Sequence, residues 1–177
     1  MKEEDNKVKL IIYEFNQCDP KKCSGHRLVK FNKVKPISIK SRFNGIMLSP
    51  EADKFISKED LNLIKKFGLG TIDCSWNKID EFNFKSLKSI KSRERHLPFL
   101  YAGNTINYGK PYKLNCLEAY ASALYILGFK EQSIDLFEGF SYVKGFFNFN
   151  KELLEKYSNC ETNEEIKKTQ EEILKNK

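Results

Sequence analysis

The sequence predicts an α/β protein whose C-terminal half is mainly helical. In the first part of the chain, runs of β-branched and aromatic residues alternate with helix-like segments, as in a largely parallel sheet. From Asn115 onward, apolar residues recur at helical spacing between N-caps and glycine stops. A chain of 177 residues with 40% hydrophobic residues can bury a stable core without disulfides or bound metals. We expect an α/β domain over residues 1–95 and a helical domain over residues 96–177, sharing a core.

Short-range signals place the N-terminal elements. The sequence NQCDPKKCSG, residues 16–25, is a loop, and Ser24 with Gly25 opens a short amphipathic helix. A second helix has Ser57 as its N-cap and Gly68 as its C-terminal stop. Strands are expected at residues 8–15, 37–39, 46–48 and within 69–76.

The C-terminal half begins after a basic connector at residues 82–96. Asn115 and Glu118 form a capping-box pattern, and Gly128 ends the helix that follows. Further helices are expected near residues 130–137, 151–157 and 164–174, the last beginning after Thr162, with the aromatic segment FSYVKGFFNFN between two of them.

The charge of the chain is +7, and the excess is uneven. Residues 151–177 hold six lysines and seven glutamates, so residues 1–150 carry 25 basic against 17 acidic residues. Such a field attracts polyanions, namely RNA, DNA or an anionic membrane surface, although a merely lysine-rich proteome gives the same count. The polar start and the short first apolar run predict neither a signal peptide nor a membrane span. We therefore expect a cytoplasmic protein without a membrane partner.

The cysteines raise the question of a metal site. Cys18 and Cys23 have C-x4-C spacing, and His26 follows at the x2 position. A zinc or iron–sulfur site needs about four converging ligands. The other cysteines stand singly, and His96 is the only other histidine. We therefore expect reduced thiols and no metal, with a metal-binding module kept as an alternative.

Three polar clusters stand after strand-like runs or between elements, where open α/β sheets bind ligands. They are residues 16–25, the DCSW sequence at 73–76, and the long loop 101–116. Asp73 suits a general base or a ligand-orienting carboxylate, and equally a turn or N-cap. Trp76 and Tyr112 suit flat walls for a ligand, or parts of the core.

Several longer motifs resemble one family. In order, they are YEFNQCDPKKCSGHRL, MLSP, TIDCSW, HLPFLYAGNTINYGKPYKLNCLEA, YILGF and LLEKYSNC. Together they resemble the small-subunit ribosomal RNA aminocarboxypropyltransferases, from about Ile11 to near the C-terminus. The resemblance implies a fold related to the knotted SPOUT class of RNA methyltransferases. It also implies S-adenosyl-L-methionine as the donor and small-subunit rRNA as the partner. The 3-amino-3-carboxypropyl group would pass to N3 of a uridine or pseudouridine, releasing methylthioadenosine.

The resemblance also assigns site residues. Asp73 would orient or deprotonate the base, and Trp76 would pack near the sulfonium methyl. The cofactor positions that the resemblance implies are Ser24, Ile72, Leu97, Tyr112 and Cys116. Relatives often have Asn-Pro where this chain has Asn104 and Thr105. A methyltransferase and a non-catalytic rRNA-binding factor remain alternatives, and we expect a monomer.

Overall fold

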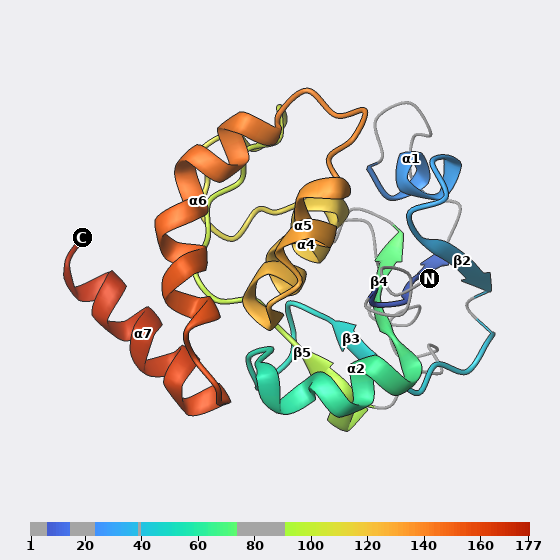
Figure 1. Ribbon diagram of the computed structural model, residues 1–177, viewed down its shortest axis with the longest axis horizontal. Helices are drawn as coiled ribbons and strands as arrows, with labels where there is room; N and C mark the ends of the chain where they lie inside the picture. The colour runs from blue at the N-terminus through green and yellow to red at the C-terminus, as the bar shows by residue number, and fades with distance from the viewer. Residues whose placement is uncertain (1–6, 15–23, 39, 74–90) are drawn as a thin grey trace.

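A five-stranded sheet forms one side of the molecule. We describe a computed structural model of the chain, covering residues 7–14, 24–38, 40–73 and 91–177. The strand order is β2-β1-β4-β3-β5, and every described pairing is parallel (Figure 1). The strands are β1 (Leu10–Glu14), β2 (Lys35–Ser38), β3 (Ile46–Leu48), β4 (Leu69–Asp73) and β5 (Glu94–Arg95). The expected α/β class with a parallel sheet is confirmed.

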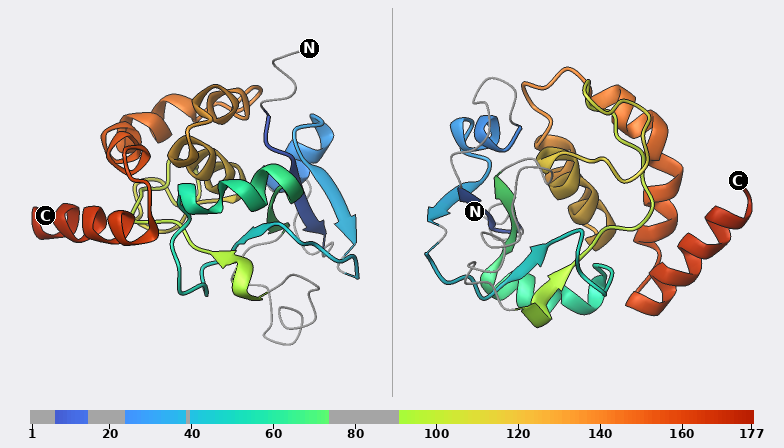
Figure 2. Two further views of the ribbon diagram at one scale, coloured as in Figure 1. Left: turned by 60° about the horizontal axis from the view of Figure 1, so that its bottom comes forward. Right: turned by 180° about the vertical axis from the view of Figure 1, so that it is seen from behind.

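Helices fill the rest of the molecule. Two views show α4 and α5 between the sheet and α6, with α7 on the far side of α6 (Figures 1 and 2). The helices are α1 (Ser24–Lys30), α2 (Leu61–Phe67), α4 (Cys116–Leu127), α5 (Lys130–Asp135), α6 (Val143–Ser158) and α7 (Asn163–Lys175), with 3-10 turns at Lys58–Asp60 and Lys91–Arg93.

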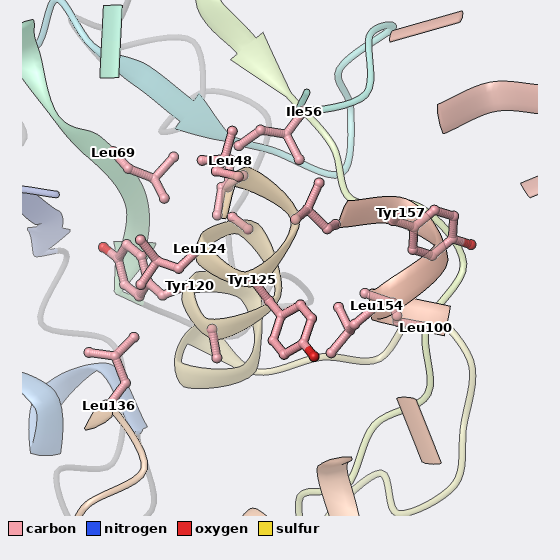
Figure 3. Close-up of a cluster of buried hydrophobic side chains, with 14 of the residues drawn as sticks. Leu48, Ile56, Leu69, Leu100, Tyr120, Leu124, Tyr125, Leu136, Leu154 and Tyr157 are labelled. Carbon is pink, nitrogen blue, oxygen red and sulfur yellow. The ribbon is translucent and has the colours of Figure 1, made fainter. Parts of the chain in front are cut away.

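Helix α4 is the centre of the core. All of its residues except Cys116 and Ala119 are buried, and a helix that is apolar on all sides belongs in an interior. Figure 3 shows Tyr120 and Leu124 of α4 on the side of Leu69 in β4. The Tyr120 hydroxyl donates a hydrogen bond to the Ile11 carbonyl oxygen. Helix α4 is therefore fixed directly to the sheet.

The helix boundaries follow the predicted caps. Asn115 and Glu118 form the reciprocal capping box, and Gly128 ends α4 with a left-handed φ of 100°. Ser57 accepts a hydrogen bond from the Glu59 N–H at the start of its helix, and Thr162 accepts one from the Glu165 N–H. These boundaries are local, so short sequence patterns were sufficient to predict them.

Two expectations were wrong. Helix α6 begins at Val143 and not near residue 151, because Phe146, Asn150 and Leu154 lie on one buried face of a continuous helix. A run of aromatic residues hid that spacing. Strand β5 lies inside the expected connector, because Glu94 and Arg95 pair with Met47 and Leu48 of β3. A buried ion pair between Arg95 and Asp60 (Nε to Oδ1, 3.0 Å) also holds this segment. Its polar sequence gives no strand signal.

The expected division at residue 95 falls at the end of β5. One hydrophobic cluster includes Leu10 and Leu69 from one side of this point and Leu124 and Leu154 from the other. The division into two domains stays a prediction. In the part of the chain that the structure describes, no helix combines the length and hydropathy that a membrane span requires.

Candidate cofactor site

The carboxyl ends of β1 and β4 lie side by side. Tyr13 pairs with Ile72, and Glu14 pairs with Asp73, in parallel register. Ligands of open α/β sheets bind outside this edge. The backbone of Ile72 and of Asp73 therefore lies at the edge where sheets of this kind bind ligands. Their side chains, and the whole of Trp76, lie outside the described residues.

The first turns of α1 and α4 meet at Ser24. Helix α1 begins at Ser24, and α4 begins at Cys116. Ser24 is 8% exposed, and its hydroxyl accepts a hydrogen bond from the Leu117 backbone N–H at 3.4 Å. The fold thus brings Ser24 next to the start of α4, although 93 residues separate Ser24 from Leu117 in the chain.

The N-cap of α4 is itself anchored. Asn115 Oδ1 accepts from the Glu118 N–H at 2.9 Å, and Asn115 Nδ2 donates to the Tyr142 hydroxyl at 2.8 Å. Burial raises the pKa of Tyr142 to about 12, so the hydroxyl stays neutral at physiological pH. The Leu117 and Glu118 N–H groups are bonded within the protein, so it is the dipole of the 12-residue helix α4 that favours an anionic group, such as a carboxylate, near this end.

Glu118 ties the long loop to α4. Glu118 is 0% exposed, and its carboxylate accepts hydrogen bonds from three donors. The donors are the Gly103 N–H at 2.6 Å, Asn104 Nδ2 at 2.6 Å and the Asn115 N–H at 3.2 Å. Burial raises the pKa of Glu118, against the lowering effect of these hydrogen bonds. Sequence analysis identified Glu118 only as half of a capping box; its contacts with Gly103 and Asn104 have no sequence signal.

The loop after β5 folds back on itself and presents Tyr112. The Tyr112 N–H donates to the Leu100 carbonyl at 3.0 Å, and its φ is 63°. Its ring is 5.4 Å from the Phe99 ring between centroids, yet the residue is 57% exposed. Partial burial raises the pKa of Tyr112. A fixed aromatic ring with an open side is suited to covering a nucleoside.

Leu97 lies at the beginning of the same loop. It is half-buried and packs against the main hydrophobic cluster. Its carbonyl oxygen is 3.1 Å from Nδ1 of His96. The described contacts therefore join Ser24 to the start of α4 and Tyr112 to Phe99. Leu97 is connected to them only through the chain.

The described residues do not test the metal alternative built on Cys18 and Cys23. Cys18, Cys23 and Cys74 lie outside the described residues. Among the residues that are described, no group of three or more His, Cys, Asp or Glu could hold a metal ion. The ring of His96 lies 4.1 Å from that of Phe55 between centroids, and burial lowers the pKa of His96.

Two basic side chains in and after α1, Arg27 and Lys33, have a structural role. Lys33 Nζ lies 2.8 Å from Asp135 Oδ2 and 3.1 Å from Glu138 Oε2. The hydrogen bond with Asp135 is the largest of the effects that raise the pKa of Lys33. Arg27 donates to the Gly139 carbonyl at 2.8 Å and lies 4.1 Å from the Phe140 ring centroid. Lys33 and Arg27 thus attach the α1 region to residues 135–140.

Two family profiles match parts of the chain. The one described as "Ribosome biogenesis protein, C-terminal" matches residues 46–174. The one described as "Possible Fer4-like domain in RNase L inhibitor, RLI" matches residues 8–41, which include Cys18 and Cys23. The first covers well over half of the chain.

The similar proteins are named as rRNA aminocarboxypropyltransferases. The chain is 45% identical to the 16S rRNA aminocarboxypropyltransferase of Methanosphaera stadtmanae, over 94% of this chain and 98% of that protein. It is 43% identical to the 16S rRNA aminocarboxypropyltransferase of Methanocaldococcus jannaschii, over 94% of this chain and 96% of that protein. It is 37% identical to the 18S rRNA aminocarboxypropyltransferase of Saccharomyces cerevisiae, of whose length it spans 53%.

A solved structure has the same architecture. It is the SAM-dependent rRNA:acp-transferase Tsr3 from Vulcanisaeta distributa, with a TM-score of 0.78 and 30% sequence identity. The match covers 95% of this chain and 96% of that one. Sequence and fold thus agree over nearly the whole length, and the chain belongs to the ribosomal RNA aminocarboxypropyltransferase family.

Proposed function

We propose that this chain transfers the 3-amino-3-carboxypropyl group of S-adenosyl-L-methionine to N3 of a uridine or pseudouridine in small-subunit rRNA, in ribosome biogenesis. The observation that carries the proposal is the 45% identity, over nearly the full length of both proteins, to a relative named 16S rRNA aminocarboxypropyltransferase. The description of the similar solved structure as SAM-dependent supports the choice of donor.

The described residues fit such a donor. S-adenosyl-L-methionine has a carboxylate and an ammonium group at one end and an adenosine at the other. The fixed start of α4, beside the Ser24 hydroxyl, suits the carboxylate. The exposed ring of Tyr112 and the apolar side chain of Leu97 suit the adenosine.

We assign the donor to the five positions that the family resemblance indicates. Ser24 and Cys116 would lie near its amino-acid end, and Ile72, Leu97 and Tyr112 near its nucleoside. Cys116 stands where some relatives have Ser or Thr, so its thiol would give a weaker hydrogen bond than a hydroxyl. What the chain contributes is mainly positioning of the two reactants.

The reaction is a displacement. The donor supplies a sulfonium leaving group that departs as neutral methylthioadenosine. A bond forms between N3 of the base and the carbon next to sulfur, while the carbon–sulfur bond breaks and its electron pair stays on sulfur. The N3 proton must leave, and we assign its orientation or removal to Asp73, at the end of β4. Trp76 would cover the sulfonium methyl group, which favours attack at the longer arm.

Product analysis tests the proposal. Purified protein is incubated with small-subunit rRNA and donor labelled in the carboxypropyl arm, and the nucleosides are analysed by mass spectrometry. The expected products are a uridine or pseudouridine that carries the labelled aminocarboxypropyl group, and methylthioadenosine without label. S-adenosylhomocysteine with a methylated base would instead identify a methyltransferase. Absence of donor binding in calorimetry would leave a non-catalytic rRNA-binding factor.

Other features of the proposal concern topology and context. We propose a SPOUT-like knotted backbone, a monomer, two domains meeting near residue 95, and a cytoplasmic location. Residues 74–90, which connect β4 to the 3-10 turn before β5, lie outside the described residues. A crystal structure with a continuous trace through residues 74–90 would test the knot, and sedimentation analysis would test the monomer.

A further inference from the structure

A group of large apolar side chains is exposed where the long loop meets α6. Ile106 is 71% exposed, Tyr108 is 64% exposed and Phe149 is 36% exposed. The rings of Tyr108 and Phe149 meet edge to face, with centroids 5.1 Å apart. Tyr108 also lies beside Gly145 of α6, where an added Cβ would make an ordinary contact of 3.6 Å with a Tyr108 ring carbon. The loop runs alongside α6 in two views (Figures 1 and 2).

This surface is basic as well as apolar. Neither residues 97–117 nor residues 139–151 contain an Asp or a Glu. Lys110 and Lys144, which flank the exposed rings in sequence, are both exposed. We call Ile106, Tyr108, Lys110, Lys144 and Phe149 the loop–α6 surface.

Ring contacts connect the loop–α6 surface to the candidate cofactor site. Phe149 lies 6.0 Å from Tyr101, Tyr101 lies 5.0 Å from Phe99, and Phe99 lies 5.4 Å from Tyr112, all between centroids. Tyr112 is one of the proposed donor positions. Three ring-to-ring contacts thus separate Phe149 from Tyr112, so a ligand on the loop–α6 surface would bind on the same part of the molecule as the proposed donor.

We propose that unpaired nucleotides of the RNA substrate bind the loop–α6 surface, with bases stacked on Tyr108 and Phe149 and phosphates near Lys110 and Lys144. Exposed aromatic rings beside lysines are the combination that single-stranded nucleic acids require, because every base has a face to stack and every nucleotide a negative charge. The absence of carboxylates from both segments favours a polyanion over an apolar protein partner. The inference rests on the proposed function, which supplies RNA as the partner.

Binding of a fluorescently labelled small-subunit rRNA hairpin, measured by anisotropy, tests this proposal. Tyr108→Ala and Phe149→Ala should each weaken RNA binding by about tenfold, the effect of losing one stacked base. Tyr108→Phe keeps the ring and should bind as the wild type does. Ile134→Ala removes an exposed apolar side chain on α5 and serves as the matched control. Lys144→Gln should reduce the salt dependence of binding, by a slope of about 0.7 for one phosphate contact.

Donor affinity, measured by calorimetry without RNA, separates this inference from the proposed function. Unchanged donor affinity with weakened RNA binding in both alanine variants would support the loop–α6 surface. Wild-type RNA affinity in Tyr108→Ala and Phe149→Ala, with an active wild-type enzyme, would overturn the surface and leave the function intact. If the wild type forms no methylthioadenosine but both alanine variants still lose RNA affinity, the proposed function fails and the RNA surface stands.

Discussion

The side-chain amide of Asn104 donates a hydrogen bond of 2.6 Å to Oε1 of Glu118, and both residues are buried. Oε2 of the same carboxylate accepts from the Gly103 N–H at 2.6 Å. One side chain in the first turn of α4 thus holds the start of the loop that carries Tyr112. The shape of the candidate site depends on this carboxylate.

Glu118→Gln should weaken donor binding and lower stability together. The amide keeps one acceptor but places an N–H₂ group against a backbone or side-chain donor, which leaves a buried polar group without a partner. That costs about 1–3 kcal/mol. Urea unfolding gives the loss of stability, and calorimetry gives the donor Kd. Full donor affinity in a destabilised variant would show that the loop does not depend on Glu118.

The pH dependence of stability should carry the signature of Glu118. Burial raises its pKa in the folded protein, so the folded state holds this proton at pH values where the unfolded chain has lost it. The contribution to stability is therefore present below the ordinary glutamate pKa of about 4.3 and is lost as pH rises through the raised value. Burial raises the pKa of Asp60 too, so the contribution of Asp60 to stability also falls as pH rises. The stability difference between wild type and Glu118→Gln, measured by urea unfolding from pH 4 to 7, should fall with rising pH.

Ser24→Ala should weaken donor binding. The change removes the hydroxyl that is proposed to lie near the amino-acid end of the donor. It also removes the acceptor of the Leu117 N–H, which lowers the free energy of unfolding by about 0.5–1.5 kcal/mol. Ser122→Ala is the matched control, because the buried Ser122 hydroxyl has no hydrogen-bond partner in the part of the chain that is described. Ser122→Ala should leave both donor affinity and stability unchanged or slightly improved. If Ser24→Ala lowers only the melting temperature, Ser24 has a purely structural role.

Gly103→Ala should displace the long loop from α6. A Cβ at Gly103 would lie 2.6 Å from the Phe146 Cα, which side-chain movement cannot relieve. Overpacking of this kind costs about 1–3 kcal/mol. Gly145→Ala offers the contrast, since its nearest contact is an ordinary 3.6 Å and alanine favours a helix by about 0.5–1 kcal/mol. Thermal unfolding should show opposite shifts for the two variants, and equal shifts would contradict the close approach at Gly103.

Asp73→Asn should lower turnover far more than donor affinity. A positioned acid or base contributes about 100-fold or more to the rate, and asparagine cannot accept a proton. Glu152→Gln, which changes an exposed carboxylate on α6, should leave turnover unchanged. Methylthioadenosine release gives the rate, and calorimetry gives the donor Kd. Equal losses of rate and affinity in Asp73→Asn would indicate a carboxylate that serves the fold or the donor and not the base.

Local patterns predicted much of the fold. Ser57, Gly68, Asn115 and Gly128 mark helix ends where the structure has them, because each cap needs residues only a few positions apart. Patterns failed where partners are distant. The polar pair Glu94–Arg95 forms a strand by pairing with Met47 and Leu48 of β3, and Arg95 also pairs with Asp60, 35 residues earlier.

The sequence by itself determined the α/β class, the capped helix ends and, through its long motifs, the family. It did so because propensities, caps and motifs are properties of neighbouring residues. Only the tertiary structure decided that Ser24 meets the start of α4, that Glu118 is a buried acceptor for Gly103 and Asn104, and that Tyr108 and Phe149 share an exposed surface. These contacts join residues that are 14 to 93 positions apart, and their partners are fixed when α4 is enclosed between the sheet and α6.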